Sequence, residues 1–364
     1  MELKVVIACG GTGGHLFPGI AVGEAMRRRG HDVLALISEK HVDSVAARGH
    51  EDIRFEKLPA VGMPRLFSPR IVPFGFHFWR TLRLCRRVIR EFGADAVLGM
   101  GGFTSMPPIL AGRGMRAATF IHESNAYPGK ANRLTARFAT HVLVGLEDCA
   151  AHFPSAKTRV VGTPLRSALT VPADRGEALR HFGLRDGLKT LAVIGGSQGA
   201  RGINNAVCRS LPDFDAGRIQ VLHLTGEADF DFVRESYAKT SLAHHVAPFS
   251  HRMDFVFAVA DLFVSRAGGS CLAELAYFGA PSILVPYPFA ADDHQLKNAQ
   301  VFSRQKAAVL MEERNLSASG FSKVVNNLMG DDETRANLGH KCKMLGRKDA
   351  AETIARIIEE ACRG

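Results

Sequence analysis

The sequence predicts an α/β protein made of two Rossmann-like, doubly wound domains, and two glycine-rich stretches carry this prediction. They are Gly10-Gly-Thr-Gly-Gly-His15 and Gly195-Gly-Ser-Gln-Gly-Ala200. Each follows an apolar run typical of a buried strand and precedes a helical pattern, so backbone N–H groups and a helix N-terminus can approach an anion there. Because the two stretches lie about half a chain apart, we expect two domains that face each other across a cleft and bind phosphorylated ligands.

The composition fits a soluble globular protein with two cores. The chain has 364 residues, 23% charged and 46% hydrophobic, and no apolar run approaches the ~18 residues that a transmembrane helix needs. The first residues have a strand pattern and lack the features of a signal peptide. Seven scattered cysteines, without zinc-ligand spacing, favour a reducing cytoplasm and no metal site. The net charge of +10 favours an anionic partner: nucleic acid, an anionic membrane or a phosphorylated substrate.

The N-terminal half alternates strand and helix patterns. The expected strands are Leu3–Ala8, Asp32–Ser38, Ala94–Gly99, Ala117–His122 and His141–Gly145. The expected helices are Pro18–Arg29, Lys40–Arg48, Ser105–Arg113 and Gly129–Phe138. This alternation is typical of a mostly parallel sheet that is covered by helices on both faces.

The segment Lys57–Arg90 departs from this alternation, because it combines seven arginines and the only tryptophan with no acidic residue. Its helical part has an apolar face of Phe78, Leu82, Cys85, Ile89 and Phe92, and a basic stripe of Arg80, Arg83, Arg87 and Arg90. The aromatic residues could belong to the core and the arginines to a solvated face. We favour the interpretation that the segment Leu66–Arg90 forms an amphipathic membrane-surface patch. Stacking on single-stranded nucleic acid is a weaker alternative, because the aromatics do not follow a sheet.

The second half begins at Gly162-Thr-Pro-Leu-Arg166, which has the composition of a linker. We therefore expect an N-terminal domain over 1–162, a C-terminal domain over 163–343, and a final helix, 344–364, that packs back on the first domain through Ile354, Ile357, Ile358 and Ala361. The expected strands are Thr190–Ile194, Ile219–Leu224, His245–Phe249, Leu262–Ser265, Ser282–Pro286 and Ala307–Met311. The expected helices are Asp174–Phe182, Arg201–Leu211, Asp229–Ala238, Met253–Ala260, Cys271–Phe278 and His294–Arg304.

Three polar groups could carry the chemistry. The stretch Gly10–His15 lacks the lysine of a Walker loop and fails the dinucleotide fingerprint at Leu16, so a tight turn without a ligand explains it equally well. His15 itself could be a general base, an anion contact or a structural residue. The second group is Arg266-Ala-Gly-Gly-Ser-Cys-Leu-Ala-Glu274. The Glu274 carboxylate can accept hydrogen bonds from both hydroxyls of a ribose, or compensate the partial charge of a helix N-terminus. The third group, Asp292–Asn298, could bind a ligand after a buried strand or cap a helix.

Six motifs then occur in one order: Gly10–His15, His122-Glu-Ser-Asn125, Gly162–Arg166, Gly195–Ala200, Arg266–Ser270 with Glu274, and Asp293-His-Gln295 with Asn298-Ala299. The set spans Gly10 to Ala299 and resembles the MurG family of peptidoglycan transferases. The resemblance implies a GT-B fold, with the donor nucleotide in the C-terminal domain and the acceptor and membrane at the N-terminal domain. It also implies no cofactor.

The implied reaction is the inverting transfer of N-acetylglucosamine from UDP-GlcNAc to the muramyl 4-hydroxyl of lipid I, which gives lipid II. The leaving pyrophosphate would be stabilised by loop N–H groups, helix N-termini and Arg166 rather than by an obligatory metal. The hydroxyl must also lose its proton to a base. For that base the resemblance leaves His15 as our candidate.

The resemblance also assigns binding residues in both domains. In the C-terminal domain they are Ser197 for the donor phosphate, Glu274 for the ribose diol, Gly269, Ser270, Cys271 and Leu272 along the nucleotide, and Gln295 for the sugar hydroxyls. In the N-terminal domain they are Thr12, Gly13 and Gly14 for the donor sugar or the acceptor pyrophosphate, and Asn125 for the sugar. The sequence departs from the family pattern at Ser124, Ser250 and His294, and none of these changes removes the core of a motif.

The implied setting is peripheral, on the cytoplasmic face of the bacterial inner membrane. The expected partners are UDP-GlcNAc, lipid I, an anionic membrane surface, and proteins of cell-wall synthesis and division, but no nucleic acid. One alternative is another UDP-sugar enzyme of this fold, such as a glycolipid synthase or a UDP-GlcNAc 2-epimerase. A second is a non-catalytic basic adaptor, which explains the charge of +10 but not six ordered ligand-type motifs.

Overall fold

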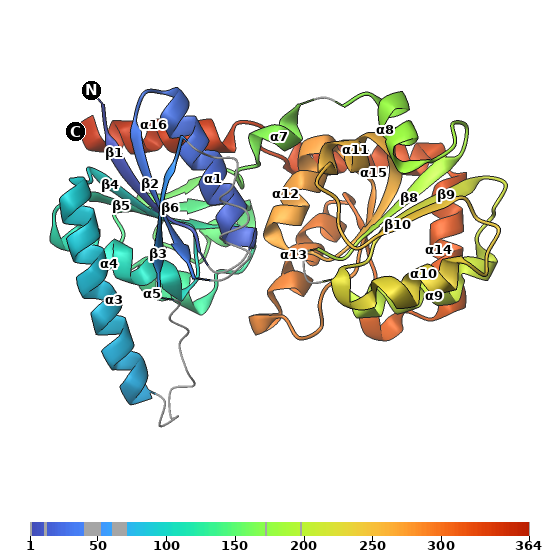
Figure 1. Cartoon of the computed structure of the whole chain (residues 1–364), viewed down its shortest axis with the longest axis horizontal. Coiled ribbons are helices and arrows are strands. Elements are labelled where there is room, and N and C mark those ends of the chain that lie inside the picture. Colours follow the sequence, from blue (N-terminus) through green and yellow to red (C-terminus); the bar gives the residue numbers. More distant parts are fainter. Residues whose placement is uncertain are drawn as a thin grey trace. The chain divides into compact units, whose positions relative to one another are not determined.

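Two parallel β-sheets organise the computed structural model, which describes residues 2–10, 13–39, 52–59, 71–171, 173–196 and 199–363. Contacts divide the chain into an N-terminal unit, Met1–Ser167 with Arg347–Gly364, and a C-terminal unit, Ala168–Gly346 (Figure 1). The helix predicted at Lys40–Arg48 lies outside the described residues. The acceptor and donor roles that the sequence assigned to two domains stay predictions.

The N-terminal unit contains a sheet whose strands are all parallel, in the order β3-β2-β1-β4-β5-β6-β7. The strands are Lys4–Ala8 (β1), Asp32–Ser38 (β2), Arg54–Leu58 (β3), Ala96–Gly99 (β4), Ala118–Glu123 (β5), His141–Val144 (β6) and Thr158–Val160 (β7). The order reverses beside β1, so the loops after β1 and β4 leave the same edge of the sheet as neighbours. Sequence analysis missed β3 and β7 because these partly exposed edge strands lack a continuous apolar run.

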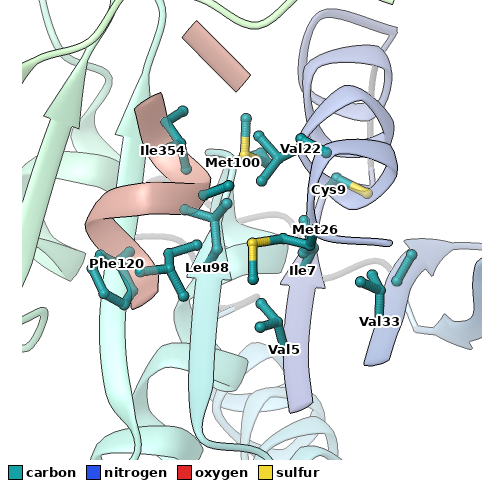
Figure 2. Packing of buried hydrophobic residues seen from close by; sticks show 14 of the residues in the cluster. Val5, Ile7, Cys9, Val22, Met26, Val33, Leu98, Met100, Phe120 and Ile354 are labelled. Atoms are coloured by element: carbon teal, nitrogen blue, oxygen red, sulfur yellow. The ribbon is translucent and has the colours of Figure 1, made fainter. Parts of the chain in front are cut away.

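Helices cover both faces of this sheet. On one face, α1 (Gly13–Arg28) packs against α16 (Ala350–Arg363), and Figure 2 shows Ile354 of α16 among core residues of β4, β5 and α1. The predicted C-terminal stripe does pack here, with Ile354 and Ile358 fully buried. Helix α1 begins at Gly13 instead of Pro18, so His15 lies in its first turn and Pro18 inside the helix.

The other face carries a second core cluster. It is covered by α3 (Ile71–Phe92), η1 (Phe103–Ser105), α4 (Met106–Gly114), α5 (Lys130–Thr135), α6 (Glu147–Ala150) and η2 (Ser155–Lys157). The two halves of α3 differ. Cys85, Ile89 and Phe92 are buried in the cluster, whereas Phe76 and Trp79 are 63% and 47% exposed. Of the predicted apolar face, Leu82 also packs against this cluster, and Phe78 is partly buried.

The C-terminal unit contains a parallel sheet in the order β10-β9-β8-β11-β12-β13. Its strands are Lys189–Ile194 (β8), Ile219–Leu224 (β9), His244–Ala247 (β10), Ala260–Ser265 (β11), Ser282–Leu284 (β12) and Val309–Leu310 (β13). Its longer helices are Arg175–Phe182 (α8), Arg201–Ser210 (α9), Phe230–Tyr237 (α10), Met253–Val259 (α11), Gly269–Phe278 (α12), His294–Arg304 (α13), Ala318–Gly330 (α14) and Asp332–Leu345 (α15). Short helices complete it at Ser167–Thr170 (α7, which begins in the N-terminal unit), Leu211–Asp213 (η3), Glu227–Asp229 (η4), Ala291–Asp293 (η5) and Glu313–Asn315 (η6).

The central strands of both sheets are buried on both faces, which explains why their apolar runs predicted them well. No helix in the described ranges is long and apolar enough to cross a membrane.

Candidate functional site

In the N-terminal unit, His15 packs against the turn that follows β4. A Cβ on Gly101 would lie 2.8 Å from His15 Nε2, and Gly101 has a φ of 122°, a conformation that favours glycine. The turn is fixed from both sides. Ser105 Oγ accepts from Gly101 N at 3.0 Å, and Thr104 Oγ1 donates to Gly10 O at 2.9 Å. The backbone therefore approaches the imidazole closely and holds it at the carboxyl edge of the sheet.

A buried carboxylate, Glu123, organises the loop after β5. It accepts from Asn125 N at 3.0 Å, Asn125 Nδ2 at 2.8 Å, Gly129 N at 3.0 Å and Asn132 Nδ2 at 2.9 Å. Four N–H donors offset the cost of burying this side chain, which is 3% exposed. Asn125 is thus held through its backbone and its side chain. Asn132 is itself buried, and its Nδ2 also donates to His122 O at 3.0 Å, so this residue stiffens the loop from inside.

His122 of the same motif is a structural residue. Its Nε2 donates to Gly162 O at 2.9 Å, which joins β5 to the loop after β7. Burial lowers the pKa of His122, the bond to Gly162 opposes this shift, and the charge of nearby His15 lowers the pKa further. A fully buried imidazole with a lowered pKa stays neutral and serves here as a tether.

Arg166 and the glycine-rich loop complete this half-site. The Arg166 guanidinium lies 4.2 Å from the centre of the Phe17 ring, a cation–π contact that places it beside α1. Gly13, half-buried, opens α1, and Gly14 follows it as an exposed residue. Two predicted ligands, Thr12 here and Ser197 in the C-terminal unit, lie outside the described residues.

In the C-terminal unit, α12 carries most of the predicted donor residues. Gly268 is its N-cap and has no side chain to satisfy the first N–H groups, so these can meet an anion. Gly269, Ser270 and Glu274 are partly buried on this helix. Leu272 is 1% exposed and its N–H donates to Gly268 O, so its side chain belongs to the core and its backbone holds the start of the helix. Burial raises the pKa of the Cys271 thiol to about 12, which leaves it neutral.

Gln295 ties two loops together. Its Oε1 accepts from Tyr287 N at 3.0 Å and from Ala267 N at 3.3 Å, so the segments after β12 and β11 share one acceptor. Asn298 Nδ2 donates to Ala267 O at 2.9 Å and strengthens the same junction. Asp293 lies at the N-cap of α13 with a φ of 53°, but no side-chain capping bond forms there. Among the described residues, no group of three or more His, Cys, Asp and Glu side chains is placed to hold a metal.

Comparison with known proteins gives the family. Residues 5–144 match the glycosyltransferase family 28 N-terminal domain, and residues 190–354 match its C-terminal domain. Relatives from Geotalea uraniireducens and Acidothermus cellulolyticus are each 37% identical; the alignments cover 99% of this chain and 99% and 98% of theirs. Both are named UDP-N-acetylglucosamine–N-acetylmuramyl-(pentapeptide) pyrophosphoryl-undecaprenol N-acetylglucosamine transferase. The chain belongs to the MurG family of glycosyltransferases.

Solved structures agree on the fold. The crystal structure of MurG from Acinetobacter baumannii has a TM-score of 0.79 at 23% identity and covers 99% of this chain and 100% of its own. UDP-GlcNAc 2-epimerase from Neisseria meningitidis has a TM-score of 0.71 at 13% identity and covers 98% and 100%. Both likenesses support the predicted GT-B class of two Rossmann-like domains, and the relatives favour the MurG family over the epimerase alternative.

Sequence analysis of the MurG motifs gave no role to three residues whose hydrogen bonds or ion pairs organise the candidate site. Glu123 stood inside a quoted motif but received no role, and Asn132 lay outside every motif. Arg266 opened a motif without a role, yet its Nη1 contacts Val285 O, Pro286 O and Glu313. The sequence offered little signal for Glu123 and Asn132, because each lies among other polar or charged residues and nothing local marks it as buried.

Proposed function

We propose that this chain transfers N-acetylglucosamine from UDP-GlcNAc to lipid I, the undecaprenyl-pyrophosphoryl-muramoyl pentapeptide, and so makes lipid II. The observation that carries the proposal is full-length similarity, at 37% identity, to two transferases with this name. The protein is therefore a hexosyltransferase of peptidoglycan synthesis.

The donor would bind at the carboxyl edge of the C-terminal sheet. The loop Gly195–Ala200 precedes α9, whose first turn holds no acidic residue and whose N-cap makes no side-chain capping bond, so its N–H groups can meet a phosphate. Glu274 on α12 would accept hydrogen bonds from both ribose hydroxyls. Since Gln295 uses its Oε1 inside the protein, its Nε2 is the group that would donate to a sugar hydroxyl.

The acceptor would bind at the N-terminal unit, with His15 as the general base. The muramyl 4-hydroxyl oxygen forms a bond to the anomeric carbon on the face opposite the leaving group, the bond from that carbon to the phosphate oxygen breaks, and the configuration inverts. His15 takes the hydroxyl proton as the new bond forms. UDP leaves as an anion that the loop N–H groups and Arg166 stabilise. Asn125 would hold a sugar hydroxyl.

The test is transfer of labelled N-acetylglucosamine from UDP-GlcNAc to a lipid I analogue, with UDP-GlcNAc binding measured by calorimetry. Glu274→Ala should weaken donor binding about tenfold to a hundredfold, because two hydrogen bonds to a charged group are lost. Glu333→Ala, an exposed carboxylate in the first turn of α15, is the matched control and should bind normally. His15→Ala should lower kcat by about 10²-fold or more while donor binding is kept.

Two outcomes would contradict the proposal in different ways. If the unmodified protein binds UDP-GlcNAc but transfers nothing to the lipid I analogue, the epimerase or another acceptor becomes the better interpretation. If it does not bind UDP-GlcNAc at all, the family assignment fails as a guide to function.

We further propose that α3 and a basic cavity bind an anionic membrane surface, as expected for an enzyme of a lipid substrate on the cytoplasmic face of the inner membrane. Val72 and Phe76 are 76% and 63% exposed at the start of α3, and the Arg83 guanidinium lies 3.5 Å from the Trp79 ring centre. Exposed aromatic residues beside arginine are typical of interfacial helices. A cavity of about 450 Å³ on the same helical layer is lined by Lys130, Arg133, Arg137, His152 and Lys157 and by no carboxylate.

Co-sedimentation with vesicles tests the membrane proposal. The double variant Phe76→Ser, Trp79→Ser should lose most binding to vesicles of anionic phospholipid, and zwitterionic vesicles should bind the unmodified protein weakly. Phe232→Ser is the control, since Phe232 is 49% exposed on the C-terminal unit. Unchanged binding by the double variant would refute the role of α3. Contacts with proteins of cell-wall synthesis and division, and hence a role in cell shape, stay predictions of the family resemblance.

A further inference from the structure

An ion pair in the C-terminal unit joins the three loops around the proposed donor site. Arg266, the residue after β11, donates from Nη1 to Val285 O and Pro286 O, each at 3.2 Å, which fixes it to the segment after β12. The same Nη1 lies 2.5 Å from Oε2 of Glu313, which comes from η6 after β13. The Arg266 side chain is 12% exposed, so these contacts hold a nearly buried cation in one place.

The carboxylate of Glu313 also reaches the first turn of α9. A Cβ on Gly202 would collide with the Glu313 carboxylate, so this side chain keeps its position only while residue 202 is glycine. Gly202 lies in the helix that the loop Gly195–Ala200 enters. Glycine is a poor residue in a helix, and the close approach of Glu313 gives a physical reason for its presence.

Each member of the ion pair depends on the other. Glu313 Oε2 is buried and has no hydrogen-bond partner in the described part of the chain, so its charge is compensated through the ion pair with Arg266. Among the described residues, every acceptor that contacts the guanidinium does so at Nη1. Its Nη2 and Nε are therefore the groups that would donate to a bound anion, and a guanidinium held from one side presents a rigid pair of donors.

We propose that Glu313 is a positioning residue for the donor diphosphate, which acts by holding Arg266 with Nη2 and Nε ready for the phosphates. The inference rests on the proposed function, since it takes the anion at α9 to be the diphosphate of UDP-GlcNAc. It deepens that proposal by adding Glu313 and Gly202, neither of which belongs to the six motifs.

The expected kinetic signature is an effect on binding rather than on turnover. Arg266 would meet the diphosphate both in the bound substrate and in the transition state, so a misplaced Arg266 raises KM and leaves kcat nearly unchanged. Glu313→Ala should raise the KM for UDP-GlcNAc and the Kd for UDP about tenfold. Glu313→Gln keeps an oxygen that can accept from Nη1, so it should restore part of the affinity.

Gly202→Ala provides the sharper test, because it moves the Glu313 carboxylate without changing the chemistry of residue 313. In the unmodified chain the new methyl group must displace the carboxylate, and the Kd for UDP should rise severalfold. In the Glu313→Ala background the same methyl group no longer meets the carboxylate, so the Kd should not change further, and the better helix residue should raise the melting temperature. Glu312→Ala is the matched control, because Glu312 pairs at 2.9 Å with the exposed Arg314.

The outcomes separate this inference from the proposed function. If the unmodified protein does not bind UDP, the proposed function fails first. If it binds UDP and Glu313→Ala binds equally well, Glu313 has no positioning role. If Glu313→Ala binds UDP more tightly, the carboxylate repels the diphosphate, which also overturns the inference. Additive effects of Gly202→Ala and Glu313→Ala would show that the glycine acts independently of the ion pair.

Discussion

The carboxylate of Glu359 joins the last helix, α16, to the first helical layer, and replacing it should destabilise the N-terminal unit. Arg29 donates from Nε to Oε1 at 2.7 Å and from Nη2 to Oε2 at 2.9 Å. His31 accepts from Leu3 N through Nδ1, so its ring hydrogen lies on Nε2 and is donated to Glu359 Oε1 at 2.8 Å. Three donors thus converge on one nearly buried carboxylate.

The magnitude follows from these contacts. A hydrogen bond to a charged group contributes about 1.5–3 kcal/mol when it is buried. The Glu359 side chain is 10% exposed but that of Arg29 is 32% exposed, so solvent screening reduces the two Arg29 bonds. Glu359→Gln keeps the shape of the side chain and one acceptor. We therefore expect the free energy of unfolding to fall by about 2–3 kcal/mol at pH 7.

The loss should depend on pH in a defined direction. The bonds from Arg29, and then from His31, lower the pKa of Glu359 from 4.5 to about 2. Because the pKa of the folded state is below that of the unfolded chain, the stabilisation is complete above about pH 4.5 and is lost as the pH falls towards 2. The difference between the unmodified protein and Glu359→Gln should therefore shrink across this window.

Urea unfolding followed by circular dichroism at pH 7, 5 and 3.5 measures this difference. Glu352→Gln is the control: Glu352 also contacts Arg29, at 3.5 Å, but its side chain is 39% exposed, so the loss should stay below about 1 kcal/mol. The reasoning fails if Glu359→Gln unfolds with the same free energy as the unmodified protein at pH 7. It also fails if the difference between them does not change with pH.

Three further predictions concern the N-terminal unit and the thiols. Gly101→Ala should lower kcat about tenfold or more and leave UDP binding unchanged in calorimetry, because the new Cβ would lie 2.8 Å from His15 Nε2; normal kcat would contradict this. Glu123→Gln should lower the melting temperature by about 5 °C, because an amide cannot accept from four N–H donors. Cys85 and Cys342 should resist iodoacetamide at pH 8 by mass spectrometry, because burial raises their pKa to about 12; rapid labelling would refute it.

Much of the fold could be predicted because its central strands are continuous apolar runs. The expected strand Ile219–Leu224 and the expected helix His294–Arg304 have the bounds that the structure gives β9 and α13. Edge strands and helix starts were harder. β3 has a mixed burial pattern, and α1 runs through Pro18, a residue that usually marks a helix start. In both cases neighbours in space, not the local sequence, stabilise the element.

The candidate site divides in the same way. The glycine-rich loops, His15 and Glu274 could be proposed from the residues themselves, because anion and diol binding require particular residue types at short spacing, whereas Asn125 was assigned through the family resemblance. Glu123 could not be given its role, because four N–H donors converge on it only after the loop has folded. The sequence left three interpretations of the aromatic segment open; the structure buries the C-terminal half of α3 in the core and leaves Phe76 and Trp79 exposed, and the membrane role stays a proposal.

The sequence by itself determined the α/β class and located the two glycine-rich loops, because each of these patterns depends on residues within a few positions of one another, and the order of six such motifs gave the family resemblance. Only the tertiary structure decided that Glu313 lies against Gly202 and Arg266. The same holds for Glu359, which accepts hydrogen bonds from Arg29 and His31. These contacts join residues tens to hundreds of positions apart. Their energies come from burial and from the geometry of charged groups, and neither exists until the chain has folded.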